Sequence, residues 1–164
     1  LPNMISQLEK IVVNAGIGRL SANTPDFEEK KLPALMEEFA IITGQRPAVR
    51  RARQSIAGFK IREGSVVGLK ATLRGRRMQY FLERLNTIVL PRVRDFRGIQ
   101  LKNIDANGNL TFGIREHITF PEIIPETSKI DFGLQVTLVP KERGRIKALA
   151  LYHALEVPLQ KEKK

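Results

Sequence analysis

The sequence contains no cysteine and only two histidines, and this scarcity removes several kinds of chemistry at once. Without cysteine there can be no disulfide framework, no thiolate nucleophile and no zinc–thiolate centre. His117 and His153 lie outside any metal-ligand spacing, and no Gly-x-Ser-x-Gly or Ser-x-x-Lys element accompanies them. We therefore expect both to be structural residues, in a protein that is not an enzyme and that uses no cofactor or metal.

Long apolar runs are missing as well, although 42% of the 164 residues are hydrophobic. No stretch approaches the ~20 apolar residues that cross a bilayer, so we expect no membrane partner. The length is close to that of one ordinary domain and is sufficient to bury a core. We expect a single domain over residues 1–164, with an extended loop at 54–65 and a flexible tail at 160–164.

Acidic residues are in the minority: 28 lysines and arginines face 17 aspartates and glutamates, which gives a net charge of +11. Most of the excess lies in one stretch, because Arg46–Arg77 holds ten cations against Glu63 alone and carries +9. The segment Asp26–Glu38, by contrast, is mainly acidic. Basic side chains gain affinity for phosphates by displacing condensed counterions. The asymmetry therefore favours a surface that binds a nucleic acid.

Alternating apolar and polar residues predict several strands. In the first, Ile11, Val13 and Ala15 would point one way, and the pair Gly16 and Gly18 would close the strand in a turn. This pair is a fragment of a dinucleotide fingerprint, but the third glycine is missing and no helix is expected directly after it. The other expected strands are Arg46–Arg53, Val66–Arg74, Gln100–Ile104, Asn109–Ile114 and Ile130–Val139.

The strand that ends at Arg74 suggests how a nucleic acid could be bound. Alternation places Val67 and Leu73, with the apolar residues between them, on one face. Lys70, Thr72 and Arg74 then share the other face. A sheet with helices on its apolar face and a bare, cationic opposite face suits a ribose–phosphate backbone, because threonine and asparagine can also contact 2′-hydroxyls and base edges.

Two amphipathic helices are expected to cover the apolar face. The first would carry the apolar stripe of Leu32–Phe39, with Pro33 near its start and Gly44 at its end. The second would span Met78–Val89 and stop before Pro91, because proline has no backbone N–H for the helix. These stripes are typical of core packing rather than of a cofactor site.

Two further segments have simple structural interpretations. Asp105–Asn109 superficially resembles a calcium loop, but its glycine is misplaced and no glutamate closes it. The Asn107-Gly108 pair instead predicts a tight hairpin turn, since it supplies the positive-φ residues that such a turn needs. Lys141–Leu155 has helical character, with two competing apolar registers.

The loop at residues 54–65 allows two interpretations. Phe59 lies between two glycines and beside Lys60 and Arg62, so an exposed loop could offer a ring for base stacking and two cations for phosphates. Alternatively, Phe59 folds back onto the edge of the sheet. The residue types favour the exposed and the folded-back position of Phe59 equally.

Several longer stretches, in order along the chain, resemble a known family. The longest are Ala52–Arg62, Lys70–Gly75 and Pro91–Gly98, and the shorter ones are Asn14–Gly18, Thr43–Pro47, Gly113–Glu116 and Phe120–Ile123, with weaker agreement through Gly144–Leu159. Together they resemble the large-subunit ribosomal protein number five family, the 5S rRNA-binding proteins of the central protuberance, in its bacterial or organellar branch.

The resemblance implies an α+β fold: a mostly antiparallel sheet, with helices packed on one face and the other face open for RNA. It implies a structural constituent of the large ribosomal subunit that binds 5S rRNA and helps organise the central protuberance. Asn14, Gln45 and Thr72 match the family's polar contacts to 5S rRNA. With the basic residues near them, the expected 5S rRNA site is Asn14, Gln45, Arg46, Lys70, Thr72, Arg74 and Arg76.

Two further contacts are implied by the resemblance. The loop, through Ser55, Gly58, Phe59, Lys60 and Arg62, would lie near the peptidyl-site tRNA and large-subunit rRNA. A surface with Arg92, Arg94, Phe96 and Arg97 would face a small-subunit ribosomal protein across an intersubunit bridge. The expected location is the ribosome, in the cytoplasm or in an organelle.

Two other hypotheses compete with this one. In a nucleic-acid-modifying enzyme, the basic stretch would hold the substrate while Asp95 or Glu116 acted with a metal; an ion pair with the neighbouring arginines explains Asp95 more simply. A general RNA chaperone would bind all structured RNAs with similar affinity.

Overall fold

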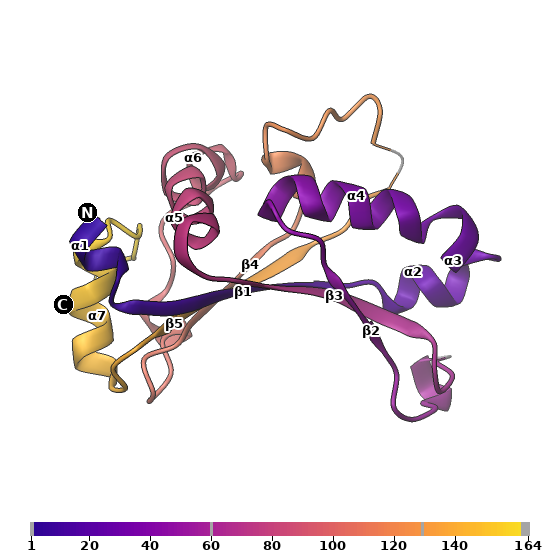
Figure 1. The fold of residues 1–164 in the computed structure, drawn as a ribbon, viewed down its shortest axis with the longest axis horizontal. Helices are drawn as coiled ribbons and strands as arrows, with labels where there is room; N and C mark the ends of the chain where they lie inside the picture. Colours follow the sequence, from indigo (N-terminus) through magenta and orange to yellow (C-terminus); the bar gives the residue numbers. More distant parts are fainter. Residues whose placement is uncertain (1, 60, 129, 162–164) are drawn as a thin grey trace.

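A five-stranded antiparallel sheet organises the part of the chain that the computed structural model describes, residues 2–59, 61–128 and 130–161 (Figure 1). Its strands are β1 (Leu8–Gly16), β2 (Ala48–Arg51), β3 (Val66–Leu73), β4 (Leu110–Ile114) and β5 (Leu134–Pro140). Their order is β2-β3-β1-β5-β4, and all neighbours are antiparallel. With helices on one face of this sheet, the predicted α+β fold is confirmed.

The central strand β1 shows why the sheet has two unlike faces. Ile11, Val13 and Ala15 are at most 1% exposed, whereas Val12 and Asn14 between them are half-buried. Burying each aliphatic side chain stabilises the fold by about 1.5–3 kcal/mol, so one face of the strand is fixed against the core. The predicted first strand and its alternation are confirmed.

Strand β3 departs from the predicted alternation at its first residues. Leu69 and Leu73 are buried as expected, but Val67 is half-buried and Val66 takes the fully buried position. The register with β2 shifts opposite these residues, between Arg50 and Arg51. Such a bulge adds one residue to one strand, so the side chains before it point to the opposite face.

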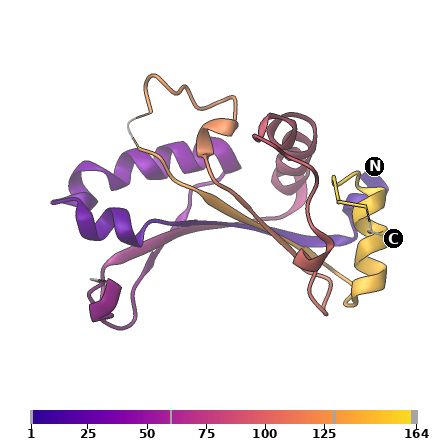
Figure 2. The same ribbon diagram turned by 180° about the vertical axis from the view of Figure 1, so that it is seen from behind.

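Two helices pack on the apolar face, α4 (Leu32–Thr43) and α5 (Gly75–Arg84) (Figures 1 and 2). The predicted stripe of α4 is confirmed: Leu35 and Phe39 are fully buried. Pro33 lies in the first turn of α4, where the N–H that proline lacks has no partner in the helix. The helix ends at Gly44, whose φ of 77° is accessible to glycine without steric cost.

The prediction that the second helix stops before Pro91 is wrong. After α5 the chain forms a π-helical turn over Leu85–Val89 and continues as α6 (Leu90–Arg92). The wide turn starts a new helical segment, and Pro91 lies in its first turn, where a missing N–H is tolerated.

The remaining helices are α1 (Pro2–Ile5), α2 (Gly18–Asn23), α3 (Phe27–Lys30) and α7 (Arg145–Ala154). Helix α2 corrects a second expectation, because a helix does begin directly after the first strand. At the other end of the sheet α1 lies beside α7 (Figures 1 and 2). There the buried Tyr152 hydroxyl of α7 donates to the carbonyls of Gly108 and Leu138, and burial raises the pKa of Tyr152. Helix α7 is thereby fixed to the sheet.

The hairpin before β4 is also partly corrected. Gln100–Ile104 does not form a strand; a 3₁₀ turn covers Leu101–Asn103, and a single bridge joins Ile104 to Leu110. Asp105 fixes the turn that follows, because its carboxylate accepts the backbone N–H groups of Asn107 and Asn109. Gly108 has the predicted positive φ, at 90°, but Asn107 does not, so the predicted turn geometry is present only in part. Among the described residues, no helix is both long and apolar enough to cross a membrane.

Candidate nucleic-acid interface

One face of the sheet is free of helices in its central part (Figures 1 and 2). Cross-strand partners point to the same face, so the strand register identifies its side chains. One row crosses the sheet through Ala48, Lys70, Asn14, Gln135 and Gly113, and the next through Thr72, Val12, Thr137 and Thr111. All nine are exposed or half-buried, and none is acidic. We call this surface the open face.

Three predicted site residues come together on the open face. Asn14 pairs with Lys70, and Thr72 lies two residues further along β3. All three are half-buried, and their side chains make no hydrogen bond or ion pair within the part of the chain described here. An amide, a hydroxyl and an ammonium group are therefore free to meet a ligand. Their assignment to 5S rRNA stays a prediction.

Gln45 lies where α4 turns into β2, and its side chain is held on both sides. Its Nε2 donates to the carbonyl oxygen of Thr72 at 3.2 Å, and its Oε1 accepts from Nη1 of Arg77 at 3.3 Å. The two bonds fix which end of the amide points to the sheet. One N–H and one lone pair remain for a ligand. Sequence reasoning gave Arg77 no role, since only the fold brings it within reach of Gln45.

Exposed arginines border the open face beside Gln45. Arg46 follows it in the chain, while Arg74 and Arg76 lie where β3 leads into α5. None of these three makes an ion pair within the described ranges. Unpaired guanidinium groups can contact phosphates bidentately without first breaking an internal bond. We call the set Gln45, Arg46, Arg74, Arg76 and Arg77 the rim.

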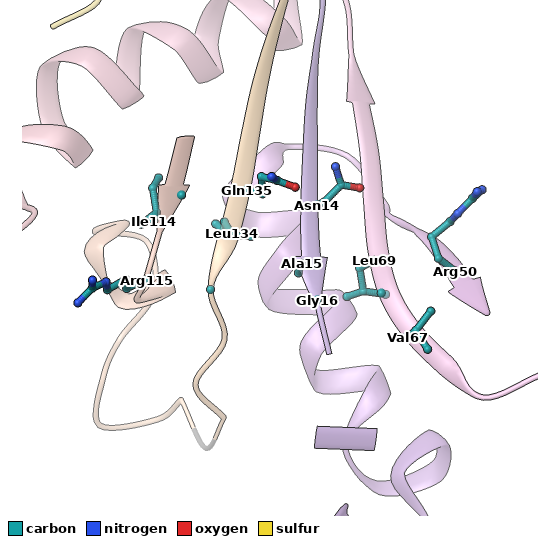
Figure 3. A pocket seen from close by; sticks show the side chains of 13 residues that line it. Asn14, Ala15, Gly16, Arg50, Val67, Leu69, Ile114, Arg115, Leu134 and Gln135 are labelled. Atoms are coloured by element: carbon teal, nitrogen blue, oxygen red, sulfur yellow. The ribbon is translucent and has the colours of Figure 1, made fainter. Parts of the chain in front are cut away.

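The far end of the open face is hollowed between two arginines (Figure 3). A depression of about 580 Å³ crosses the ends of the strands from Arg50 to Arg115. Asn14 and Gln135 lie on neighbouring strands between these arginines (Figure 3). The full lining is Asn14, Ala15, Gly16, Arg50, Val67, Gly68, Leu69, Gly113, Ile114, Arg115, Gly133, Leu134 and Gln135, which we call the trough. Sequence reasoning missed Gln135 and Arg115, although the alternation of β5 carried a signal for the first.

Residues 54–65, which we call the arm, project beyond β2 and β3. Two backbone hydrogen bonds join Ile56 and Ile61, so the arm begins as a narrow hairpin. The Ser55 hydroxyl accepts from the N–H of Glu63 at 2.9 Å and therefore helps to shape the arm. Gly58 and Arg62 are exposed. Lys60 and the side chain of Phe59 lie outside the described residues, so the two interpretations of Phe59 both remain predictions.

Arg51 ties the arm to the acidic segment of the chain. Its Nη1 donates to Glu28 Oε1 at 2.7 Å and to the carbonyl oxygen of Gly64 at 3.0 Å. The hydrogen bond from Arg51 lowers the pKa of Glu28 and raises that of Arg51 itself. Arg51 belongs to the basic stretch, but its side chain is thus bonded within the protein, where it stabilises the base of the arm.

The expected bridge-side residues surround the turn after α6. Arg92, Arg94 and Arg97 are exposed, while Phe96 is half-buried against the core. Asp95 forms no ion pair with a described residue, which corrects the simple explanation given for it. Its φ of 54° makes it a turn residue, a conformation that aspartate tolerates better than most residues.

The two histidines occupy very different positions. His117 is fully buried, stacks on Phe132 and places Nε2 3.2 Å from Glu38 and 3.0 Å from the Ser128 hydroxyl. This contact joins α4 to the segment before β5. His153 is exposed on α7. No group of three metal-binding side chains occurs within the described ranges.

Comparisons with known proteins agree over nearly the whole chain. Residues 2–62 match the family described as ribosomal protein L5, and residues 66–159 match the family described as the C-terminus of the same ribosomal proteins. The chain is 46% identical to the large ribosomal subunit protein uL5 of Rubrobacter xylanophilus, over 97% of this chain and 86% of that protein. It is 45% identical to uL5 of Mycoplasma pneumoniae, over 96% and 84%.

These relatives decide between the hypotheses drawn from the residues. Proteins of this kind are structural parts of the large ribosomal subunit and are not enzymes, so the nucleic-acid-modifying enzyme is set aside and the expectation of a non-enzymatic, rRNA-binding protein is confirmed. The resemblance drawn from the sequence is confirmed as well. The chain belongs to the ribosomal protein L5 family.

Proposed function

We propose that this ribosomal protein binds 5S rRNA through the open face and helps organise the central protuberance of the large subunit. The observation that carries the proposal is the uncovered, acid-free sheet face on which Asn14, Lys70 and Thr72 lie together with unbonded side chains. Gln45, fixed by Thr72 and Arg77, borders the same surface. These groups match the chemistry of ribose and phosphate.

The proposed site divides into two kinds of contact. Arg46, Arg74 and Arg76 supply salt-dependent affinity, because each guanidinium that neutralises a phosphate releases counterions. Asn14, Gln45 and Thr72 supply directional hydrogen bonds, which only an RNA of matching shape can satisfy. Lys70, next to Asn14, adds a phosphate contact at the centre of the sheet.

We propose a second contact for the arm, with the peptidyl-site tRNA and nearby large-subunit rRNA. Two features support it: the arm stands away from the sheet, and its exposed residues include Gly58 and Arg62. Ser55 contributes through the hairpin geometry that it fixes. Phe59 and Lys60 complete the proposed contact on sequence grounds.

A third proposed contact faces a small-subunit ribosomal protein across an intersubunit bridge. The exposed guanidinium groups of Arg92, Arg94 and Arg97 form a basic surface on the turn after α6. Phe96, half-buried beneath them, anchors this turn to the core. The protein would thus act in the ribosome of a cytoplasm or of an organelle.

Competition between 5S rRNA and bulk tRNA at physiological salt tests the main proposal. The full chain should retain 5S rRNA when tRNA is in large excess, because only 5S rRNA satisfies the directional contacts. Equal displacement by both RNAs would favour the general RNA chaperone instead. Salt is held constant, since affinities for nucleic acids change steeply with ionic strength.

A further inference from the structure

Four glycines line the trough, and at two of them the surrounding backbone leaves little room for a side chain. A Cβ atom on Gly68 would lie 3.2 Å from the carbonyl oxygen of Ala15, and one on Gly133 would lie 3.3 Å from that of Arg115. Both distances are tighter than ordinary contacts, so a side chain at either position would require the neighbouring backbone to shift by a few tenths of an ångström.

The other two glycines, Gly16 of β1 and Gly113 of β4, have no such explanation. A Cβ on Gly16 would meet nothing within 4 Å, and one on Gly113 only the carbonyl of Leu134, at 3.8 Å. Neither has a positive φ. Glycine weakens a strand relative to residues with side chains, and in strand interiors it often marks the close approach of a ligand or another backbone. The fold does not account for these two glycines.

The residues that line the trough indicate which kind of ligand could approach Gly16 and Gly113. Arg50 and Arg115 lie at its two sides, Asn14 and Gln135 contribute amides, and none of the thirteen lining residues is acidic or aromatic. Base stacking needs aromatic side chains, whereas phosphates and 2′-hydroxyls need cations and amides. The charge and chemistry of the trough therefore fit the backbone of RNA better than its bases.

We propose that the trough is a seat for the RNA sugar–phosphate backbone, which approaches the peptide backbone of β1 and β4 at Gly16 and Gly113. Arg50 and Arg115 hold the phosphates on either side, and the Gln135 amide meets a ribose hydroxyl. The inference rests on the proposed function, and it extends the RNA surface across β5 and β4, where Arg115 and Gln135 become contact residues.

Gly16→Ala and Gly113→Val test the proposal in the full chain, because each fills the space that the RNA would occupy. Neither side chain meets a close backbone atom, so the thermal unfolding midpoint should stay equal to that of the wild type or rise. Affinity for 5S rRNA at constant salt should fall, by about tenfold for the valine, which corresponds to about 1.4 kcal/mol of binding free energy.

Gly18→Ala is the matched control. It adds the same methyl group two residues beyond Gly16, outside the trough, at ordinary distances of 3.7 Å from Ile61 and Val67. It should bind 5S rRNA as the wild type does. Gln135→Ala provides an independent variant, since it removes an exposed side chain and leaves the strand intact; its affinity should fall about threefold.

The outcomes separate this inference from the proposed function. Wild-type selection of 5S rRNA over tRNA, with full affinity in both glycine variants and in Gln135→Ala, would overturn the trough alone. A lower unfolding midpoint for both glycine variants would also overturn it, because the glycines would then serve the fold. If the wild type failed to select 5S rRNA, the proposed function would fail. The same three variants would then be tested with the RNA that the chain does bind, and full affinity in all three would overturn the trough as well.

Discussion

The two ends of the open face differ in what they offer a ligand. At the rim, Arg74 and Arg76 extend long cationic side chains, and Gln45 is held in place by its neighbours. In the trough, Gly16 and Gly113 offer no side chain at all. Charge attracts any polyanion, whereas a hollow accepts only a backbone of fitting shape. Under the proposed function, the arginines of the rim would supply most of the salt-dependent affinity, and the trough would add contacts that depend on the shape of the RNA.

Removing charge from the rim should have the largest effect. In the Arg74→Ala/Arg76→Ala double variant, affinity should fall by about tenfold per arginine, as expected when charged hydrogen bonds are removed. Because phosphates are common to all RNAs, 5S rRNA and tRNA should be affected alike, and the slope of log K against log salt should become shallower by roughly two units. Filter binding across a salt series measures both quantities. A reduction confined to 5S rRNA would contradict the division between rim and trough.

Thr72→Val, between the rim and the trough, should have a smaller and more selective effect. The change keeps the shape and the β-branch of the side chain but removes a hydroxyl that has no partner in the described part of the chain. Affinity for 5S rRNA should fall about fivefold with an unchanged salt slope, as for one neutral hydrogen bond. An equal loss of affinity for an unrelated RNA hairpin would show that the Thr72 hydroxyl makes no contact that is selective for 5S rRNA.

Arg77→Ala tests whether this rim arginine positions Gln45 or binds phosphate itself. If it positions Gln45, selectivity for 5S rRNA over tRNA should fall about threefold while the salt slope stays unchanged. The effect should disappear when Gln45 is already alanine, because the two residues act through one hydrogen bond. Additive effects in the double variant would instead assign Arg77 to a phosphate.

The smallest effect is expected at the base of the arm. The pKa of Glu28 is lowered in the folded chain, so the contribution of its bond to Arg51 is fully present above the ordinary carboxyl pKa. It is lost as the pH falls through the lowered value. The protection of the Gly64 amide, whose N–H bonds to Ala52, should then fall relative to neutral pH. The measured exchange rate is divided by the intrinsic rate at each pH, because the intrinsic exchange of an amide slows as the pH falls. Glu28→Gln should show no such pH dependence; an identical response in both chains would rule out this carboxylate.

Much of the sheet could be predicted because its signals are local. The alternation of β1 and the positions of Pro33 and Gly44 each depend on a few neighbouring residues, and each prediction was confirmed. The bulge at Val67 escaped prediction because it depends on the pairing of β2 with β3, and the π-helical turn because the apolar spacing of the helix does not mark it. The strand pairing also supports our proposal of one domain, since β1 lies between β3 and β5, which both belong to the segment that matches the C-terminal family.

The candidate site was predictable only in part, because local sequence patterns do not encode contacts between distant residues. Asn14, Lys70 and Thr72 could be placed from alternation within their own strands. The bond from Arg77 to Gln45 joins residues 32 positions apart and leaves no trace in local pattern. The trough could be found only from the pairing of all five strands, because each strand contributes to its lining.

Because β1 lies at the centre of the sheet, the open face is complete only after strands from distant parts of the chain have been synthesised. This strand leaves the site of synthesis long before β5, yet its register pairs Val12 with Thr137. Such distant pairing makes folding slow and leaves β1 without one neighbour until β5 has been made. A nascent or truncated chain therefore has basic residues but no complete sheet on which to arrange them. The proposed recognition of RNA shape would therefore have to wait until β5 has been synthesised.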